Sequence, residues 1–341
     1  MSNRRKFRRV FLHAGLGKTG TSSIQTQLLN HAKLLEDEYD IHFPREFSGP
    51  QRFNGNHSSL LSFMFIDHHG APQSHALTRF RSKEQANRYP EKIRKHFEKG
   101  FTTSKASQLL ISAEGLGHFS KPRLRLLAEW LSEVAEEVQL IVCLRHPLAA
   151  LSSEIQQRLN LGYVLEDLYE QPPRYRFENL FDRLETAFPE SNFVVYDFAE
   201  ATKSPEGLIG FFYKKIGLDP KLVSQKSIRS NESMSHEAAL LLSALNRAQP
   251  MLEGNTRSKL RSPGDVQGFL SIPGEKFQAP KEVYDLLEGQ IVDDLAWLRE
   301  RYGLELVSKS ITHRADYRSF SDESIQQIAL KLSKLSKVEP W

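Results

Sequence analysis

Four short segments with an apolar centre stand out along the chain, at residues 10–12, 108–112, 140–144 and 192–197. Apolar runs of this length without alternation are typical of strands that are buried on both faces of a parallel sheet. Between the runs, apolar residues return every three or four positions, which is the spacing of a helix with one buried face. The pattern therefore predicts an α/β fold of three layers, with a central, mainly parallel sheet of about five strands flanked by helices.

Helical patterns also set the expected domain organisation. They cover residues 24–35, 121–138, 148–159, 178–188 and 283–302, and a last one covers residues 321–335. Residues 36–56 are polar and contain prolines and glycines, so we expect a loop there. A chain of 341 residues is long enough for one large core. The sequence predicts a single domain at 1–310, with an insertion at about 40–105, followed by a helical extension at 311–341.

The turn after the first run carries the densest candidate chemistry. Its residues are three glycines, one lysine and four hydroxyl side chains: Gly15, Gly17, Gly20, Lys18, Thr19, Thr21, Ser22 and Ser23. The first N–H groups of a helix have no internal partner and carry partial positive charge. Glycines let the backbone close on an anion. We therefore expect a phosphate-binding loop between the first strand and the first helix.

Two kinds of phosphate loop compete for this stretch. The nucleotide P-loop has the form G-x-x-x-x-G-K-[ST]. Gly17, Lys18 and Thr19 match its end, but Leu12 stands where its first glycine belongs. The alternative is K-[ST]-G-T-[TS], the pattern of the 5′-phosphosulfate loop of sulfotransferases, and residues 18–22 match it at every position.

A second stretch agrees with the sulfotransferase pattern. Arg145 directly follows the run at 140–144, and Ser153 lies eight residues later on the next helical pattern. An arginine fork and a helix hydroxyl can converge on one phosphate. This R-x-P-x5-S arrangement resembles the 3′-phosphate motif of sulfotransferases. The run at 192–197 ends in Tyr196 and Asp197 where the family has Tyr-Glu-Asp, and the family's tyrosine often lies near the adenine; a core position for Tyr196 is the alternative.

Over about residues 7–305, the chain thus resembles the sulfotransferases that use 3′-phosphoadenosine 5′-phosphosulfate (PAPS), especially the bacterial and carbohydrate-type members. The resemblance implies a P-loop-like version of the three-layer fold. It also implies transfer of a sulfuryl group to a hydroxyl or amine of a carbohydrate or small molecule, with 3′-phosphoadenosine 5′-phosphate (PAP) as product. Insertions such as 40–105 shape the acceptor pocket in that family. The implied cofactor-binding residues are Gly17, Lys18, Thr19, Gly20, Thr21, Ser22, Arg145, Ser153 and Tyr196, and Lys18 is also implied to be catalytic.

Glu114 is the candidate for the catalytic base. It follows the run at 108–112, and ligands of open α/β sheets bind outside the carboxyl ends of the strands. If this strand neighbours the first, Glu114 lies near the phosphate loop, where a carboxylate can take the acceptor's proton. Carbohydrate-type sulfotransferases commonly use a glutamate on the corresponding strand. A carboxylate that merely favours a helix start is the structural alternative, and His118 is the other candidate base.

The chain departs from the family pattern at two places, so the residues that make two of the cofactor contacts are not identified by the motifs. Cytosolic-type members have a tryptophan where this chain has Ser23, so adenine stacking must come from elsewhere. Their C-terminal Arg-Lys-Gly loop is also missing. Four basic residues are candidates to replace it: Arg257, Lys259, Arg261 and Lys276.

Composition and charge limit the partners and the cellular location that we expect for the protein. A net charge of +4 suits an anionic cofactor without indicating nucleic acid as a partner. No stretch of about 18 apolar residues occurs, so we expect no integral membrane segment. The single cysteine, Cys143, lies in an apolar run, which excludes an internal disulfide and favours a reducing, cytoplasmic location.

Two other functions stay open on the sequence alone. One is a P-loop kinase or NTPase that uses ATP and Mg²⁺, with Asp197 as the acidic residue at a strand end. The other is a non-catalytic nucleotide-binding protein of the same fold. The identity of the acceptor and the oligomeric state cannot be read from the sequence.

Overall fold

The computed structural model describes residues 6–45, 54–65, 83–174, 176–222, 234–253, 256–258, 261, 264–308, 320, 325, 326 and 328. The chain divides into two compact units. The first comprises Met1–His146, Arg176–Arg229 and Asp293–Val307, and the second comprises Pro147–Tyr175, Ser230–Val292 and Ser308–Trp341. The single domain expected at 1–310 stays a prediction, and the extension expected at 311–341 lies almost wholly outside the described residues.

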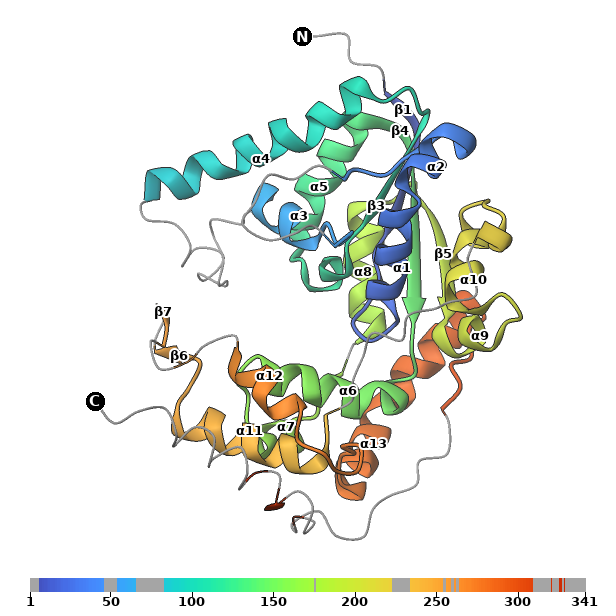
Figure 1. The fold of residues 1–341 in the computed structure, drawn as a ribbon. Helices are drawn as coiled ribbons and strands as arrows, with labels where there is room; N and C mark the ends of the chain where they lie inside the picture. The colour runs from blue at the N-terminus through green and yellow to red at the C-terminus, as the bar shows by residue number, and fades with distance from the viewer. Residues whose placement is uncertain are drawn as a thin grey trace. The chain divides into compact units, whose positions relative to one another are not determined.

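A five-stranded parallel sheet forms the centre of the first unit (Figure 1). Its strands are β1 (Phe7–His13), β2 (Ile41–His42), β3 (Gln108–Ser112), β4 (Ala135–Leu144) and β5 (Asn192–Asp197). Their order is β2-β3-β1-β4-β5, and every pair is parallel. The central position of β1 puts the turn after it at the middle of the carboxyl edge of the sheet, between the ends of β3 and β4.

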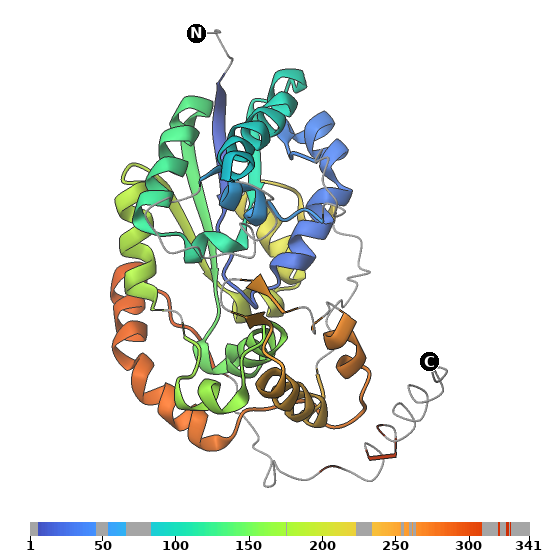
Figure 2. The ribbon, with the colours of Figure 1, turned by 90° about the vertical axis from the view of Figure 1, so that its left-hand side faces the viewer.

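Helices cover both faces of this sheet, which confirms the predicted three-layer α/β fold (Figure 2). One face carries α1 (Thr21–Asn30), α2 (Ala32–Tyr39), α9 (Phe198–Lys203) and α10 (Gly207–Lys215). The other carries α5 (Lys121–Val134) and α8 (Phe177–Ala187). Alternate side chains of the strands enter the core under α1 and α10: Phe11, Leu110, Ile141, Cys143 and Tyr196.

Three sequence predictions about the boundaries were wrong. The helix expected at 24–35 is interrupted at His31, so that α1 and α2 are separate helices. The loop expected at 36–56 instead contains the end of α2 and the short edge strand β2. The helix expected at 121–138 ends at Val134, because residues 135–138 pair with β1 and begin β4. Pairing with the sheet there outweighs the helix-forming side chains of the segment.

The first unit also contains α3 (Ser58–Met64), α4 (Lys83–Thr103) and two 3₁₀ turns, η2 (Glu114–His118) and η3 (Pro220–Leu222). The second unit contains α6 (Pro147–Asn160), α7 (Leu165–Glu170), α11 (His236–Ala248), β6 (Leu252–Glu253), β7 (Thr256–Arg257) and α12 (Gly264–Leu270). The long helix α13 (Lys281–Tyr302) contributes residues to both units. Across the described residues, every helix is too short or too polar to cross a membrane.

Candidate active site

The turn between β1 and α1 has an unusual backbone. Lys18 has a φ of 63° and Gly20 a φ of 72°, both in the left-handed region. For a lysine, this conformation costs about 1–2 kcal/mol and persists only where neighbours hold it. Two side chains do so, since Arg145 Nη1 donates to the Lys18 carbonyl at 2.9 Å and Thr19 Oγ1 donates to the Leu16 carbonyl at 2.6 Å. Strain held in this way is typical of a binding loop.

The amino end of α1 is open to an anion. Its N-cap residue is Gly20, which offers no side chain, and the first turn contains no acidic residue. The first amide that bonds back is that of Ser23, which donates to the Gly20 carbonyl at 3.0 Å. The amides of Thr21 and Ser22 therefore precede the bonded part of the helix, and their partial positive charge is not offset by a carboxylate of the first turn.

Two glycines allow the turn to close on its surroundings. A Cβ at Gly15 would lie 2.2 Å from Cγ2 of Thr21, and a Cβ at Gly20 would lie 2.2 Å from Cδ2 of Leu208. A side chain at either position would force its neighbour to shift, and the positive φ of Gly20 also disfavours one. The turn thus forms a tight cradle, of the kind that brings backbone amides close to a phosphate or sulfate group.

Glu114 lies beside this cradle. β3 pairs with β1 in a register that sets Ser112 opposite His13, and Glu114 follows two residues later. The Thr21 hydroxyl donates to Oε2 of Glu114, and Nδ2 of Asn56 donates to Oε1 at 3.0 Å. The structure therefore brings Glu114 to the amino end of α1, as its predicted role requires. The role itself stays a prediction.

A buried polar network lies beneath the turn. Nε2 of Gln25 donates to the Ser112 hydroxyl oxygen at 3.2 Å, and Nδ1 of His13 lies 2.9 Å from the same oxygen. The Ser112 hydroxyl can either donate to His13 Nδ1 or accept from it. Among the residues that the structure describes, His13 Nε2 is buried with no hydrogen-bond partner, and a Cβ at Gly15 would lie 3.2 Å from it. Burial lowers the pKa of His13 to about 4, so the ring is neutral at pH 7.

Arg145 lies at the carboxyl end of β4, next to the turn. Besides its bond to the Lys18 carbonyl, its guanidinium stands 5.1 Å from the centre of the Phe198 ring. The half-buried side chain is thus anchored beside the cradle. Ser153 is half-buried on α6, which belongs to the second unit, and its partnership with Arg145 stays a prediction.

Tyr196 and Asp197 are both buried in the first unit, where they make contacts that support the fold. Tyr196 is 1% exposed, lies in the core under α10 and pairs in register with Cys143. Burial raises the pKa of both the Tyr196 hydroxyl and the Cys143 thiol. The position fits the core alternative for Tyr196, and its contact with an adenine stays a prediction. The buried Asp197 caps α9, because its Oδ1 accepts from the Ala199 amide at 3.0 Å.

The remaining candidates have varied surroundings. His118 is exposed at the end of η2, and Lys276 is exposed in the second unit. Arg261 is 5% exposed, and its Nη1 donates to Asn246 Oδ1 at 3.0 Å and to the Gln249 carbonyl at 2.7 Å. Its guanidinium therefore holds the end of α11. Arg257 is on β7, where only the backbone is described, and Lys259 lies outside the described residues.

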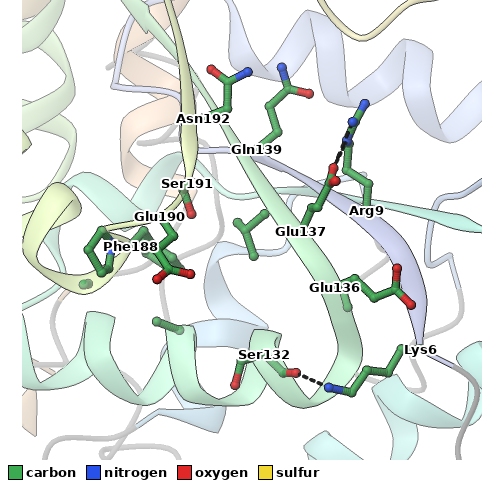
Figure 3. A pocket seen from close by; sticks show the side chains of 15 residues that line it. Lys6, Arg9, Ser132, Glu136, Glu137, Gln139, Phe188, Glu190, Ser191 and Asn192 are labelled. Carbon is green, nitrogen blue, oxygen red and sulfur yellow. Dashed lines mark hydrogen bonds and ion pairs between the residues drawn. The ribbon is translucent and has the colours of Figure 1, made fainter.

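A cavity of about 660 Å³ opens at the opposite, amino edge of the sheet (Figure 3). Its walls include Lys6, Arg9, Glu137, Gln139 and Asn192, from the starts of β1, β4 and β5. Arg9 and Glu137, neighbours on β1 and β4, form an ion pair in its wall, with 2.9 Å between Nη2 and Oε2. Since the phosphate-loop candidates lie at the carboxyl edge, this cavity is separate from the candidate site.

Sequence reasoning missed three polar residues of the site: His13, Gln25 and Asn56. Asn56 lies in a segment that was expected to be loop, and its contact with Glu114 spans 58 positions of the sequence. A local signal exists only in the Asn54-Gly55-Asn56 sequence, which is typical of a tight turn. His13 and Gln25 follow ordinary apolar and helical patterns and carry no motif of their own.

Comparisons with known proteins add little to this geometry. No protein-family model matches the chain, and no curated protein matches it. Among solved structures, it is similar to a sulfotransferase from Alicyclobacillus acidocaldarius, with 12% identity, a TM-score of 0.45, and coverage of 89% of this chain and 97% of that one. It is also similar to the sulfotransferase domain from the curacin biosynthetic pathway, with 12% identity, a TM-score of 0.35, and coverage of 84% and 98%. Because both TM-scores lie below 0.5, we take no functional conclusion from either.

Proposed function

We propose that this protein is a sulfotransferase that moves a sulfuryl group from PAPS to a hydroxyl or amine of a carbohydrate or small molecule. The observation that carries the proposal is the hydrogen bond from the Thr21 hydroxyl to Glu114. It joins the K-[ST]-G-T-[TS] loop at residues 18–22 to a carboxylate from the neighbouring strand. Transfer to a hydroxyl or amine requires a site that binds the anionic donor and, beside it, a base that takes the acceptor's proton.

The donors of the turn fit a phosphosulfate. Lys18 offers a full positive charge, α1 offers uncapped amides, and the cradle closes where Gly15 and Gly20 lack side chains. The buried, neutral ring of His13, whose Nε2 faces Gly15, lies beneath the cradle. PAPS would supply the activated sulfuryl group, and the protein would supply position and charge.

Each residue then has one task. Lys18 binds the 5′-phosphosulfate and stabilises the negative charge that develops on its bridging oxygen. The amides of residues 19–22 and the hydroxyls of Thr21 and Ser22 hold the other oxygens. Arg145, with Ser153, binds the 3′-phosphate. Glu114 takes the proton of the acceptor.

The kinase or NTPase alternative fits less well. Its loop lacks the first glycine, where the chain has Leu12 in the middle of β1. Its candidate for metal binding, Asp197, uses one carboxylate oxygen to cap α9. A non-catalytic protein of the same fold would have no use for a carboxylate bonded to the loop, although it would bind the same nucleotide.

Calorimetric titration with PAP tests the proposal, with ATP·Mg²⁺ and 5′-AMP as competing ligands. We expect PAP to bind most tightly. Arg145→Ala should weaken PAP binding by about tenfold or more, the effect of losing one charge-assisted contact. Arg125→Ala, on the exposed face of α5, is the matched control and should leave binding unchanged. A preference for ATP·Mg²⁺ would overturn the proposal in favour of a P-loop enzyme.

A further inference from the structure

Residues 54–58 form a bracket at the end of β3, and we refer to them by that name. The amide of His57 donates to the Ser112 carbonyl at 2.8 Å, and the amide of Ser112 donates to Nδ1 of His57 at 3.1 Å. The amide of Gly115 donates to the Ser58 hydroxyl oxygen at 2.9 Å. These bonds lie on both sides of Glu114 in the sequence, so the bracket grips the backbone that carries the candidate base.

The anchor of the bracket is a buried, neutral histidine. Nε2 of His57 lies 3.1 Å from the Pro44 carbonyl oxygen, and Nδ1 lies 3.2 Å from the Ser112 carbonyl oxygen. Both ring nitrogens are therefore held by the backbone on either side of the ring. Burial lowers the pKa of His57 to about 4, which keeps the ring neutral at pH 7.

The bracket also packs directly against α1. Gly55 has a φ of 89°, and a Cβ there would lie 2.3 Å from the carbonyl oxygen of Gln25. Only glycine permits both the backbone conformation and this approach. The bracket therefore spans from the helix of the anion cradle to the strand of the candidate base, and it fixes one relative to the other.

Within the bracket, the orientation of the Asn56 side chain is determined by its bonds. Its Oδ1 accepts from the Ser58 amide at 2.9 Å, so the amide group turns its NH₂ toward Oε1 of Glu114, 3.0 Å away. From the other side, Arg183 Nη2 donates to the Gly117 carbonyl at 3.0 Å and holds the end of η2. The Asn56 amide and the Thr21 hydroxyl together hold the Glu114 carboxylate in one orientation.

We infer that Asn56 is a positioning residue that makes Oε2 of Glu114 the oxygen that receives the acceptor's proton; this rests on the proposed function. Nδ2 of Asn56 can only donate, so a proton on Oε1 would face another hydrogen. The Thr21 hydroxyl, bonded to Oε2, can donate or accept and tolerates either state. The proton therefore passes from the acceptor hydroxyl to Oε2, at the edge of the anion cradle, and Glu114 becomes a neutral acid.

The test compares Asn56→Ala and Asn56→Asp with wild type in the release of PAP from PAPS, with water alone and with a panel of methyl glycosides as acceptors. Asn56→Ala should lower kcat about tenfold, the effect of losing one hydrogen bond to a charged group. KM for PAPS and the Kd for PAP should change by less than about twofold, because Asn56 touches the base and not the loop. Asn56→Asp should lose more, since two carboxylates would face each other. Asn30→Ala, an exposed asparagine at the end of α1, is the matched control and should behave as wild type.

Different outcomes would overturn the proposed function and the role assigned to Asn56. A wild-type protein that binds no PAP would remove the proposed function and this inference together. A wild type that binds PAP and releases it from PAPS, while Asn56→Ala keeps its kcat, would remove only the inference. A loss of PAP affinity as large as the loss of kcat would show that Asn56 supports the loop as a whole, and would also overturn the assigned role. Thermal unfolding of each variant checks that the fold is intact.

Discussion

Acid should destabilise the first unit through two histidines buried beside the candidate site. His13 and His57 are both 0% exposed, and burial lowers the pKa of each from 6.5 to about 4. In the unfolded chain, each ring takes up a proton near pH 6.5, whereas in the folded protein it does so only near pH 4. Because the unfolded state binds more protons between these values, stability is fully present above about pH 6.5 and falls as the pH drops toward about 4.

The size of the effect follows from the two pKa values. One pKa unit corresponds to ~1.4 kcal/mol, so each histidine contributes about 3 kcal/mol over the whole window. Between pH 7 and pH 5, the loss is about 2 kcal/mol for each ring and about 4 kcal/mol for both. This is a large fraction of the free energy of unfolding of a typical domain, about 5–15 kcal/mol.

Urea unfolding at pH 7 and pH 5 measures this loss, with the fluorescence of the buried Trp130 as the signal. In His13→Gln, the difference between the two pH values should shrink by about 2 kcal/mol, because one of the two titrating rings is gone. Asn30→Ala changes an exposed residue that carries no titratable group and should leave the difference as in wild type. If His13→Gln keeps the full pH dependence of wild type, then the His13 ring is not held neutral by burial.

Two substitutions in the turn test the cradle itself. Lys18→Ala should lower turnover of PAPS by about 10²–10³-fold, since it removes a charged donor from the site of developing charge, while circular dichroism and the unfolding temperature stay near those of wild type; near-normal turnover would exclude Lys18 from the mechanism. Gly15→Ala should weaken PAP binding in calorimetry, because its Cβ would overlap Cγ2 of Thr21, 2.2 Å away, and force the turn open. Gly289→Ala, where a Cβ meets nothing within 4 Å, is the control, and equal affinity in the two variants would contradict the tight closure of the turn.

The parts of the fold that could be predicted are those with strong local patterns. The centre of β3 and the later part of β4 are continuous apolar runs, because strands buried on both faces need no polar alternation. β2 escaped prediction because it consists of two residues at the sheet edge, too few to show a period. The start of β4 was not predicted either. Glu136 and Glu137 favour a helix locally, but residues 135–138 pair with β1 and so form a strand.

Some residues of the candidate site could also be predicted from local patterns, and others could not. The loop motif at residues 18–22 is contiguous, and Glu114 could be placed because the carboxyl ends of parallel strands share one edge. The contact of Asn56 could not be predicted, since its partner Glu114 lies 58 positions away and the pattern around Asn56 shows only a loop. For Tyr196 the sequence left a core position and a position near an adenine open, and its ring is buried in the core under α10.

The most direct test of the central claim is transfer of ³⁵S from labelled PAPS to a panel of glycans and small hydroxyl compounds, run with wild type and Glu114→Gln. We expect label to reach at least one acceptor with wild type. Glu114→Gln should bind PAP as wild type does but transfer label about 10²–10⁴-fold more slowly, the usual loss for a missing general base. Equal rates would place the base elsewhere. No transfer by wild type to any acceptor, despite tight PAP binding, would contradict the sulfotransferase proposal and favour a non-catalytic nucleotide-binding protein.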